Sequence, residues 1–219
     1  MRPERLVLVA GTGTDIGKTW VSAHLLATLR AAGVTVAARK LAQSFEPSDD
    51  PAGLDAAVLG HATGELPETV CPTSRWYEVA MAPPMAADVL SRPTFSVQDL
   101  CAELTWPATA ISVGLVESAG GVRSPQADDG DVITLMELLE PDIVVLVADA
   151  GLGTINSVRL SVAALQTALP TGATLVILLN RYDPVADLHV RNRQWLIERD
   201  QFTVLTGPDE INALASLIA

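Results

Sequence analysis

Basic residues are scarce in this sequence. There are 14 lysines and arginines against 26 aspartates and glutamates, which gives a net charge of −12 at pH 7. A protein that neutralises nucleic-acid phosphates over a large surface needs the opposite balance. No basic cluster borders a hydrophobic face, as binding to a membrane surface would require. We therefore expect neither nucleic acid nor membrane among the partners, and any polyanion that binds is expected to be small and held locally.

Long hydrophobic runs and a cysteine framework are also missing. No stretch is apolar over enough residues to cross a bilayer, and the chain enters a short strand at residues 5–10 without a secretory leader. The two cysteines, Cys71 and Cys101, share no metal-ligand spacing with each other or with the three histidines. This pattern predicts neither a disulfide framework nor a zinc site. A cytoplasmic protein is expected.

Apolar residues are plentiful, at 49%, and 219 residues suit one domain spanning positions 1–219. Runs rich in valine, isoleucine and leucine alternate with stretches of helical spacing. Continuous apolar strands covered by helices are typical of a buried parallel sheet, so the sequence predicts a doubly wound α/β domain. The predicted strands are residues 6–10, 34–38, 110–116, 143–148, 175–179 and 202–205, and the predicted helices include 19–32, 155–169 and 186–199.

Residues 42–80 are the least regular part of the chain. Proline and aspartate recur there, which predicts mobile loops around one short helix at residues 54–62. Loops at strand ends are where α/β proteins bind ligands. This segment is therefore expected to border a binding site.

The segment GTGTDIGKT lies between the first predicted strand and the first predicted helix. A glycine-rich turn in that place directs backbone N–H groups and the positive end of a helix dipole at one spot, which is an anion site. Lys18 adds a positive charge for the β- and γ-phosphates, and the Thr19 hydroxyl can reach a Mg²⁺ that bridges them. The segment therefore predicts binding of ATP, or a relative, and Mg²⁺. Its residues are Gly11, Thr12, Gly13, Thr14, Asp15, Ile16, Gly17, Lys18 and Thr19.

The glycine spacing differs from the strict phosphate-loop pattern by one residue. That pattern places its first glycine at the position of Thr12, whereas the glycine here is Gly11. Gly13 keeps the turn permissive, and the strand-to-helix context is the one that the motif requires. The alternative is that the glycines merely shape a tight turn and that Lys18 is solvated.

Acidic and polar residues follow three later strands. Glu117 ends the third predicted strand beside a double glycine, so its carboxylate is expected at the same sheet edge as the phosphate loop, where a hard cation would favour it. A capping or surface acid is the alternative. Thr154 and Asn156 stand where a helix begins, which fits either contact with substrate or ordinary helix capping. Asn180 follows the strand 175–179, where its amide can pair with a base edge.

Two further charged residues lie near the irregular segment. Lys40 closes the second predicted strand and precedes Ser44, which places a cation and a hydroxyl on the loop nearest the first strand. A lysine at a strand end is more often a solvated surface charge. Asp55 opens the short helix, where an acid is more often a helix N-terminal residue than a metal ligand.

Taken together, these segments resemble the dethiobiotin synthetase family. Its pattern includes a G-T-x-T-x-x-G-K-T loop with its first glycine at the offset of Gly11, which accounts for the unusual spacing. The resemblance continues in the order of the chain and spans nearly all of it. Its other segments are KLAQS at 40–44 for K-P-V-x-[ST], VESAGG at 116–121 for V-E-G-A-G-G, and GLGTIN at 151–156 for G-x-L-G-[CT]-[IL]-N.

The resemblance implies a reaction in which 7,8-diaminononanoate takes up CO₂ as a carbamate, which attacks the γ-phosphate of ATP. The carbamic-phosphoric anhydride then closes to the ureido ring of dethiobiotin and releases ADP and phosphate. Positioning and charge neutralisation are the main aids to phosphoryl transfer. The fold implied is that of the P-loop NTPases.

The resemblance also implies a role for each candidate residue, and a homodimer interface near the diamine. The catalytic residues would be Lys18, Lys40, Thr14 and Ser44, of which Thr14 and Ser44 would help to hold the carbamate or phosphate. Mg²⁺ would be held by Thr19, Asp55 and Glu117, and adenine would be faced by Asn180. The small-molecule substrate would be approached by Ser44, Ala119, Gly120, Gly121, Thr154 and, across a homodimer interface, Asn156.

Several positions depart from the family pattern. Leu41 stands for the usual proline, Phe45 for the glycine that follows the [ST], and Ser118 for the first glycine of V-E-G-A-G-G. Ser118 is expected to put a side chain where bare backbone approaches the substrate, and Phe45 is bulky enough to reshape the pocket. The segment 204–210 matches poorly with the turn that borders the nucleotide base in the family. These departures concern the substrate pocket more than the ATP site.

Three alternatives remain from the sequence. A partner-regulated switch ATPase of the partitioning type would carry a second lysine in the phosphate loop, where this chain has Gly13. An amidating synthetase of the cobyrinate type would need a glutaminase domain, for which no room is expected. A diverged homologue that binds ATP but acts on another substrate, or does not turn over, would fit the departures at Leu41, Phe45 and Ser118.

Overall fold

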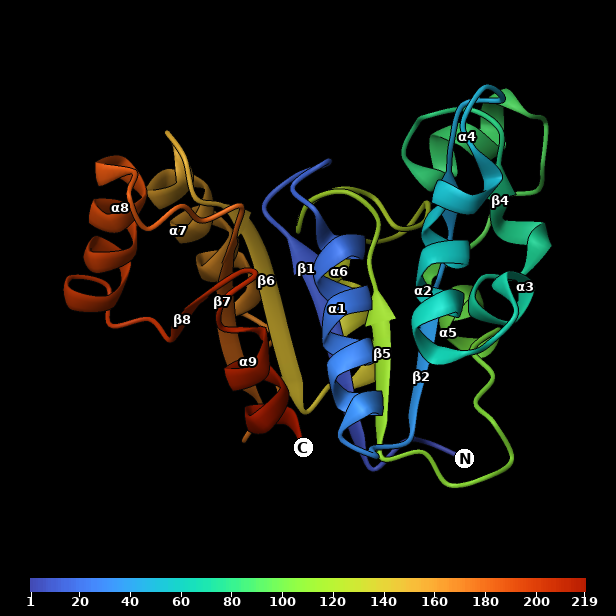
Figure 1. Cartoon of the computed structure of the whole chain (residues 1–219). Helices are drawn as coiled ribbons and strands as arrows, with labels where there is room; N and C mark the ends of the chain where they lie inside the picture. The colour runs from blue at the N-terminus through green and yellow to red at the C-terminus, as the bar shows by residue number, and fades with distance from the viewer.

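A computed structural model describes all residues, 1–219, and its largest sheet has six parallel strands and is twisted (Figure 1). The strand order is β2-β5-β1-β6-β7-β8, and every neighbouring pair is parallel. The doubly wound α/β prediction is thus confirmed. The strands of this sheet are β1 (Arg5–Gly11), β2 (Val36–Lys40), β5 (Val113–Glu117), β6 (Ile143–Asp149), β7 (Thr174–Asn180) and β8 (Val204–Thr206).

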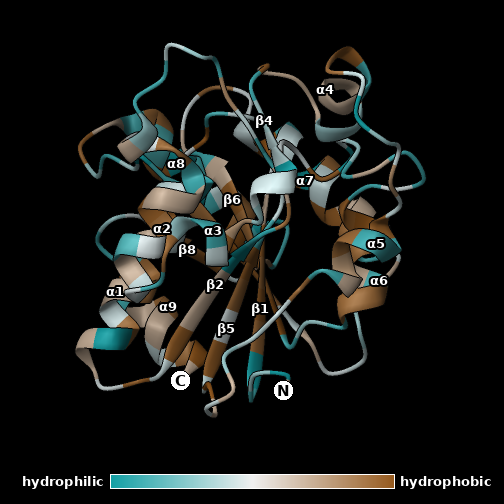
Figure 2. Ribbon diagram, turned by 90° about the vertical axis from the view of Figure 1, so that its right-hand side faces the viewer, coloured by the Kyte–Doolittle hydropathy of each residue, from teal (hydrophilic) through white to brown (hydrophobic).

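Helices cover both faces of the sheet (Figure 2). Alternate residues of β1 point to opposite faces, so Val7 and Val9 belong to one apolar core and Leu6 and Leu8 to the other. The first core is closed by α1, α2 and α9, and the second by α5, α6 and α7. The helices are α1 (Lys18–Ala31), α2 (Asp55–Thr63), α3 (Pro67–Val70), α4 (Pro83–Val89), α5 (Val97–Ala102), α6 (Val132–Leu139), α7 (Thr154–Leu165), α8 (Asp187–Glu198) and α9 (Ile211–Ile218).

Most predicted elements are present, with shifted ends. The second strand was predicted to start at residue 34, but it starts at Val36, because Gly33 has a φ of 83° and the Val34 N–H still bonds to the Leu29 carbonyl at the end of α1. This arrangement is a glycine-terminated helix end. The third strand likewise starts later, at Val113, and α7 ends at Leu165 rather than at 169.

The irregular segment 42–80 is more ordered than its composition predicts. The predicted helix is α2, which runs one residue further than expected at its end. Loops alone were expected on either side of it, and this was wrong. The segment also contains α3, two 3-10 helices, η1 (Pro51–Gly53) and η2 (Thr73–Arg75), and a two-stranded parallel sheet of β3 (Gln43–Ser44) and β4 (Trp76–Tyr77).

The parallel arrangement brings the functional loops to one end of the molecule. The carboxyl ends of β1, β2 and β5 lie side by side, and both chain termini lie at the opposite end of the sheet (Figure 1). Register is specific here: Lys40 is the Cα partner of Glu117, and Glu117 is also the Cα partner of Val9. No helix of the protein combines the length and the apolar character needed to span a membrane.

Candidate active site

The phosphate loop joins β1 to α1, as the sequence predicts. Gly17 precedes the helix with a φ of 87°, a conformation that favours glycine, and no side chain caps the helix start. A Cβ on Gly11 would lie 2.8 Å from the Ile16 side chain, so the loop closes tightly over its own first glycine. The backbone N–H groups at the start of α1 are therefore available to an anion.

A neighbouring strand holds this loop in place. Asn180, the last residue of β7, donates its amide hydrogen to the Ile16 carbonyl at 2.9 Å. A Cβ on Gly17 would lie only 2.2 Å from the same amide nitrogen. Asn180 is 5% exposed, and in this structure its side-chain amide contacts the loop backbone. Its expected contact with adenine stays a prediction.

Lys18 lies over the loop rather than in solvent. Its ammonium group donates to the Gly13 carbonyl at 3.1 Å, and the residue is only 7% exposed. Burial, together with the nearby charge of Lys40, lowers the pKa of Lys18 to about 8. The solvated-lysine alternative is therefore wrong. The Lys18 side chain is folded back onto the loop, and its role toward a phosphate stays a prediction.

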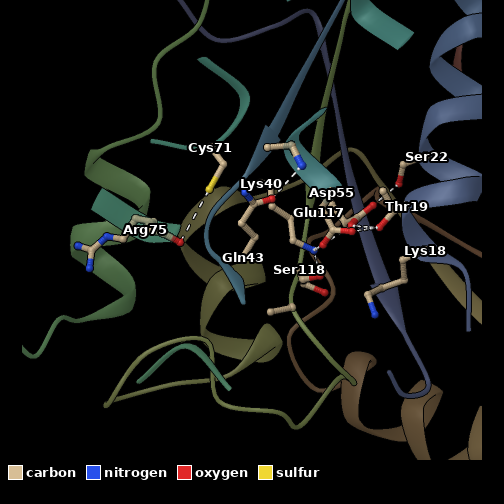
Figure 3. Close-up of polar contacts among 12 residues, drawn as sticks. Lys18, Thr19, Ser22, Lys40, Gln43, Asp55, Cys71, Arg75, Glu117 and Ser118 are labelled. Carbon is tan, nitrogen blue, oxygen red and sulfur yellow. Dashed lines mark hydrogen bonds and ion pairs between the residues drawn. The ribbon is translucent and has the colours of Figure 1, made fainter. Parts of the chain in front are cut away.

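Three oxygen-bearing side chains converge beside Lys18 (Figure 3). The Thr19 hydroxyl lies 2.6 Å from Asp55 Oδ1 and 2.9 Å from Glu117 Oε1. A hydroxyl has one proton, so it cannot donate fully to both carboxylates at once. Three oxygens that share one point in this way fit the preference of a hard divalent cation for oxygen ligands. The arrangement joins α1, α2 and β5.

Lys40 forms an ion pair with each of the two carboxylates in this structure. Its ammonium nitrogen lies 2.7 Å from Asp55 Oδ2 and 2.8 Å from Glu117 Oε1. Burial alone would lower the pKa of Lys40, but the two carboxylates outweigh it and raise that pKa. Burial would raise the pKa of Asp55, but Lys40 and the bond from Thr19 lower it. Both residues are thus held in their charged forms, and the surface-charge alternative for Lys40 is wrong.

Ser22 completes the group, and the sequence analysis missed it. Its hydroxyl donates to Glu117 Oε2 at 2.7 Å, and both residues are fully buried. Ser22 lies three residues after Thr19 on α1, so the two hydroxyls share one helix face. This spacing was the available signal. Glu117 is therefore a buried residue held by three side chains, and not a surface acid.

A cavity of about 710 Å³ opens from the phosphate loop toward β3 and α4. Phe45 and Met81 are the largest apolar side chains of its lining. Glu117 lies beneath this surface and does not line it. The predicted site residues that line the cavity are Thr14, Asp15, Gly17, Lys18, Thr19, Lys40, Ser44, Asp55, Ala119 and Gly120, and the lining residues that were not predicted as site residues are Ala42, Gln43, Phe45, Asp49, Ala80, Met81, Ala82, Pro83, Ser124 and Arg181.

The loop after β5 is fixed against the phosphate loop. Gln126 accepts from the Ala119 N–H at 2.9 Å and donates to the Ala119 carbonyl at 2.7 Å, which pins that residue at the cavity wall. A Cβ on Gly121 would lie 3.4 Å from Gly13 Cα, so the two glycine-rich loops nearly touch. Gly121 itself does not line the cavity. Gln126 was another residue without a motif to mark it.

The departures from the family pattern have unequal consequences. Leu41 is 4% exposed and packs in the core, and Ser118 is fully buried outside the cavity. The expected intrusion of the Ser118 side chain into the pocket was wrong, because the chain turns it into the protein. Phe45 does line the cavity, with its ring edge-on to Trp76 at 6.4 Å between centroids.

The structure separates two predicted substrate residues from this cavity. Thr154 is 5% exposed at the start of α7, its hydroxyl has no hydrogen-bond partner, and Asn156 is exposed. Neither lines the cavity of the same chain, because α7 follows β6 on the far side of β1 from Lys40. Contact of Asn156 with a substrate in a partner subunit remains a prediction.

Comparison with known proteins identifies the family. A family profile described as an AAA domain matches residues 5–207. The chain is 37% identical over 174 residues to the ATP-dependent dethiobiotin synthetase of Caulobacter sp. (strain K31), covering 78% of this chain and 74% of that protein. It is 33% identical over 226 aligned positions to the enzyme of the same name from Anaeromyxobacter dehalogenans, covering 98% of this chain and 97% of that protein.

Solved structures agree at the level of the fold. A nucleotide-binding protein in complex with ADP from Archaeoglobus fulgidus superposes with a TM-score of 0.55 at 14% identity, covering 99% of this chain and 87% of the other. A plasmid partition protein from Borrelia burgdorferi gives 0.56 at 12% identity, covering 99% and 97%. Such low identity shows a shared P-loop NTPase fold and no more. The sequence relatives, at 37% and 33% identity over most of the chain, establish that the chain belongs to the family of ATP-dependent dethiobiotin synthetases.

Proposed function

We propose that residues 1–219 form one ATP-binding domain that catalyses the Mg²⁺-dependent ring closure of 7,8-diaminononanoate with CO₂ to dethiobiotin. The observation that carries the proposal is the meeting of the phosphate loop with the Lys40, Asp55 and Glu117 group on one cavity. The named relatives, one of them matched over 98% of this chain, support the same reaction. No feature of the site favours a partner-regulated switch.

In this proposal the phosphate loop binds the β- and γ-phosphates of ATP. Its backbone N–H groups and Lys18 face the cavity from the start of α1. Thr19, Asp55 and Glu117 would hold Mg²⁺, and their converging oxygens fit that ion. When bound, Mg²⁺ would neutralise charge on the phosphates. Asn180 is proposed to face adenine from its place beside the loop.

Lys40 lines the same cavity as the phosphate loop and as the apolar residues Phe45 and Met81. A carbamate formed on one amine of the substrate attacks the γ-phosphorus, and the bond to the bridging oxygen breaks to release ADP. The second amine then attacks the carbamate carbon, and phosphate leaves. Lys40 and Lys18 neutralise the oxygens on which negative charge accumulates, while Thr14 and Ser44 orient the carbamate and phosphate from the cavity wall.

The remaining part of the substrate pocket is proposed to come from a second subunit. Ala119 and Gly120 line the cavity, held by Gln126, with Gly121 beside the phosphate loop. Asn156 lies outside the cavity of its own chain, so a homodimer is needed for its proposed approach to the diamine. Thr154, at the start of the same helix, would support that position.

The test is synthesis of dethiobiotin from defined components. The purified protein with 7,8-diaminononanoate, bicarbonate, ATP and Mg²⁺ is expected to yield dethiobiotin by mass spectrometry, and removal of Mg²⁺ with a chelator is expected to stop the reaction. Lys18→Ala is expected to lose the activity. Arg30→Ala, which removes a cation from the last turn of the same helix, is the matched control and is expected to retain it. ATP consumption that ignores the diamine would overturn the proposal.

A further inference from the structure

Trp20 is a surface residue of α1 that directly follows Lys18 and Thr19 of the phosphate loop. It is 38% exposed, although tryptophan is on average a largely buried residue. An exposed indole is therefore present next to the proposed ATP site. Neither the motifs of the sequence nor the reaction as proposed above gives this residue a role.

One face of the indole is already covered. The His24 imidazole stacks on it, with 3.7 Å between ring centroids and 28° between ring planes. His24 lies one turn further along α1, and its Nδ1–H donates to the Trp20 carbonyl at 2.8 Å. Helical side chains lean toward the N-terminal end of their helix. The face of the indole that His24 leaves free is therefore the one turned toward the start of α1, where the phosphate loop lies.

Three parts of the chain meet beside this ring. Trp20 Cβ lies 4.0 Å from the position of a Cβ on Gly17, and the Cζ3 edge of the ring lies 3.8 Å from the position of a Cβ on Gly207, the residue after β8. Asn180 Oδ1, at the end of β7, lies 3.5 Å from the same position on Gly207. The helix that follows Gly207, α9, lies side by side with α1 on one face of the sheet (Figure 1).

The place of the ring selects its ligand. A flat aromatic face next to an anion site fits a flat aromatic group that is joined to a phosphate chain, which is a nucleotide base. An ammonium group of the diamine could also lie over an indole. However, Trp20 lies beside the end of β8, whereas Lys40, which is assigned to the carbamate, ends β2 at the opposite edge of the sheet. The base is therefore the part of the substrates that lies nearer to Trp20.

We propose that Trp20 is a nucleotide-binding residue whose indole stacks on the purine base of ATP, with His24 supporting its other face. The inference rests on the proposed function, in which the phosphate loop holds the β- and γ-phosphates and Asn180 faces adenine. Stacking uses the π-face of the base and needs no hydrogen bond, so it adds affinity without reading the base edge. Trp20 contacts the base and leaves the phosphates to the loop.

The experiment separates the base from the phosphates. Calorimetry measures the affinity for a non-hydrolysable ATP analogue and for inorganic tripolyphosphate, both with Mg²⁺. We expect Trp20→Ala to weaken binding of the analogue by about tenfold or more, the size of one base–aromatic stack, and to keep tripolyphosphate binding within about twofold. Trp20→Phe keeps a smaller ring and is expected to lie between. Trp195→Ala removes a 46% exposed indole from α8 and is the control, with neither affinity changed.

Tryptophan fluorescence gives a second measurement that does not depend on the stability of Trp20→Ala. A base stacked on an indole quenches its emission. The ATP analogue is therefore expected to lower the emission of the wild type and of Trp195→Phe, and to lower that of Trp20→Phe much less. Tripolyphosphate, which has no base, is expected to leave the emission of all three proteins unchanged.

Other outcomes count against the inference. Equal weakening of the analogue and of tripolyphosphate in Trp20→Ala would mean that the ring only supports the phosphate loop. A raised Michaelis constant for the diamine, with unchanged affinity for the analogue, would assign the indole face to an ammonium group instead.

The wild-type protein distinguishes this inference from the proposed function. If the wild type binds the analogue through Trp20 but makes no dethiobiotin, the proposed function fails and the inference stands. If the wild type makes dethiobiotin and Trp20→Ala binds the analogue as the wild type does, only the inference is overturned.

Discussion

At the residue scale, the single buried hydroxyl of Ser22 contributes to both the stability of the protein and the orientation of the Glu117 carboxylate. It fixes Glu117 Oε2, which leaves Oε1 directed at Thr19 and Lys40. We expect Ser22→Ala to lower the free energy of unfolding by about 1.5–3 kcal/mol, because a bond to a buried charge is lost. We also expect the Mg²⁺ concentration for half-maximal activity to rise by about tenfold, as happens when a group that orients a metal ligand is removed.

Denaturant unfolding and a Mg²⁺ titration of the activity check these two effects. Ser22→Thr keeps the hydroxyl, so its Mg²⁺ concentration for half-maximal activity is expected to be close to the wild-type value. Ser161→Ala removes an equally helical, 8% exposed serine on α7 and serves as the control. If Ser22→Ala lost stability while its Mg²⁺ requirement matched the wild type, Ser22 would have a structural role only.

Phe45 is the departure from the family pattern that reaches the cavity. Phe45 gives the wall of the cavity an apolar surface, and its ring packs edge-on against Trp76. We expect this wall to receive the methylene chain of the diamine, so Phe45→Ala removes apolar contact worth about 1–3 kcal/mol. The Michaelis constant for the diamine is expected to rise by about fivefold or more at unchanged ADP affinity. A lower constant for the diamine would mean that Phe45 obstructs the pocket.

The sequence identified functional residues that follow strands in glycine-rich loops, and it missed residues whose side chains bond to backbone groups elsewhere in the chain. Lys18, Thr19 and Glu117 follow strands in glycine-rich contexts, so chemistry and position agreed. Gln43 and Gln126 act through amide bonds to backbone groups at Ala56 and Ala119, and such pairings depend on the folded path of the chain. The local spacing of residues in the sequence does not indicate these hydrogen bonds.

At the scale of elements, the phosphate loop packs against the end of β7. Gly17 combines a positive φ with close contact to the Asn180 amide. We expect Gly17→Ala to cost about 2–3 kcal/mol in stability, partly from backbone strain and partly from this contact. In an Asn180→Ala background the same change is expected to cost at least about 0.5 kcal/mol less, since the contact is gone.

A double-mutant cycle by chemical denaturation, with nucleotide binding measured on the same proteins, tests this coupling. The equivalent change at Gly172, which also has a positive φ but nothing near its Cβ position, isolates the backbone term. Strict additivity of Gly17→Ala and Asn180→Ala would show that the two residues do not share a contact energy.

The segment between β2 and α4 shows where element prediction fails. Two-residue strands such as β3 and β4 have no period to read, and their pairing joins Gln43 to Trp76 across 33 positions of sequence. The apolar contacts that order the segment are equally non-local: Cys71 is fully buried in the core beneath β2 and α2. Composition rich in proline and aspartate predicts loops, and here tertiary packing overrides it.

Cysteine reactivity reports on the packing of this segment, through Cys71, and of α5, through Cys101. Burial raises the pKa of Cys71 to about 12 and that of Cys101 to about 11. A raised pKa keeps a thiol neutral at pH 8, where an ordinary thiol near 8.5 is partly ionised, so both should react more than about 100-fold more slowly than in the unfolded chain. A disulfide reagent with and without urea measures this. Fast native labelling of Cys71 would mean that the segment opens readily.

For the molecule as a whole, the fold class could be predicted from the sequence, whereas the order of the strands in the sheet could not. Alternating apolar strands and helical stretches predicted a parallel sheet, yet the order β2-β5-β1-β6-β7-β8 depends on which strands pair. That order, and the register that aligns Lys40 with Glu117, decide which polar residues meet. The strand order also places α7, with Thr154 and Asn156, after β6 and away from Lys40, which the separate motifs do not indicate.

The exposed apolar residues near α7 give the last prediction its basis. Leu152 is 93% exposed in the loop before α7 and Leu160 is 66% exposed on that helix. Both lie close in sequence to Asn156, the residue whose proposed contact with the diamine needs a second subunit. If two subunits bury this surface against each other, the same interface stabilises the homodimer and brings Asn156 to the pocket of the second subunit.

We therefore expect Leu152→Asp combined with Leu160→Asp to change the sedimenting mass from twice 23.0 kDa to 23.0 kDa. The monomer is expected to keep ADP affinity, because the phosphate loop belongs to one chain, and to raise the Michaelis constant for the diamine by about tenfold or more. Leu66→Asp, at a 64% exposed leucine before α3, is the control. A monomeric variant with wild-type diamine kinetics would place the whole pocket within one chain, and Asn156 outside the reaction.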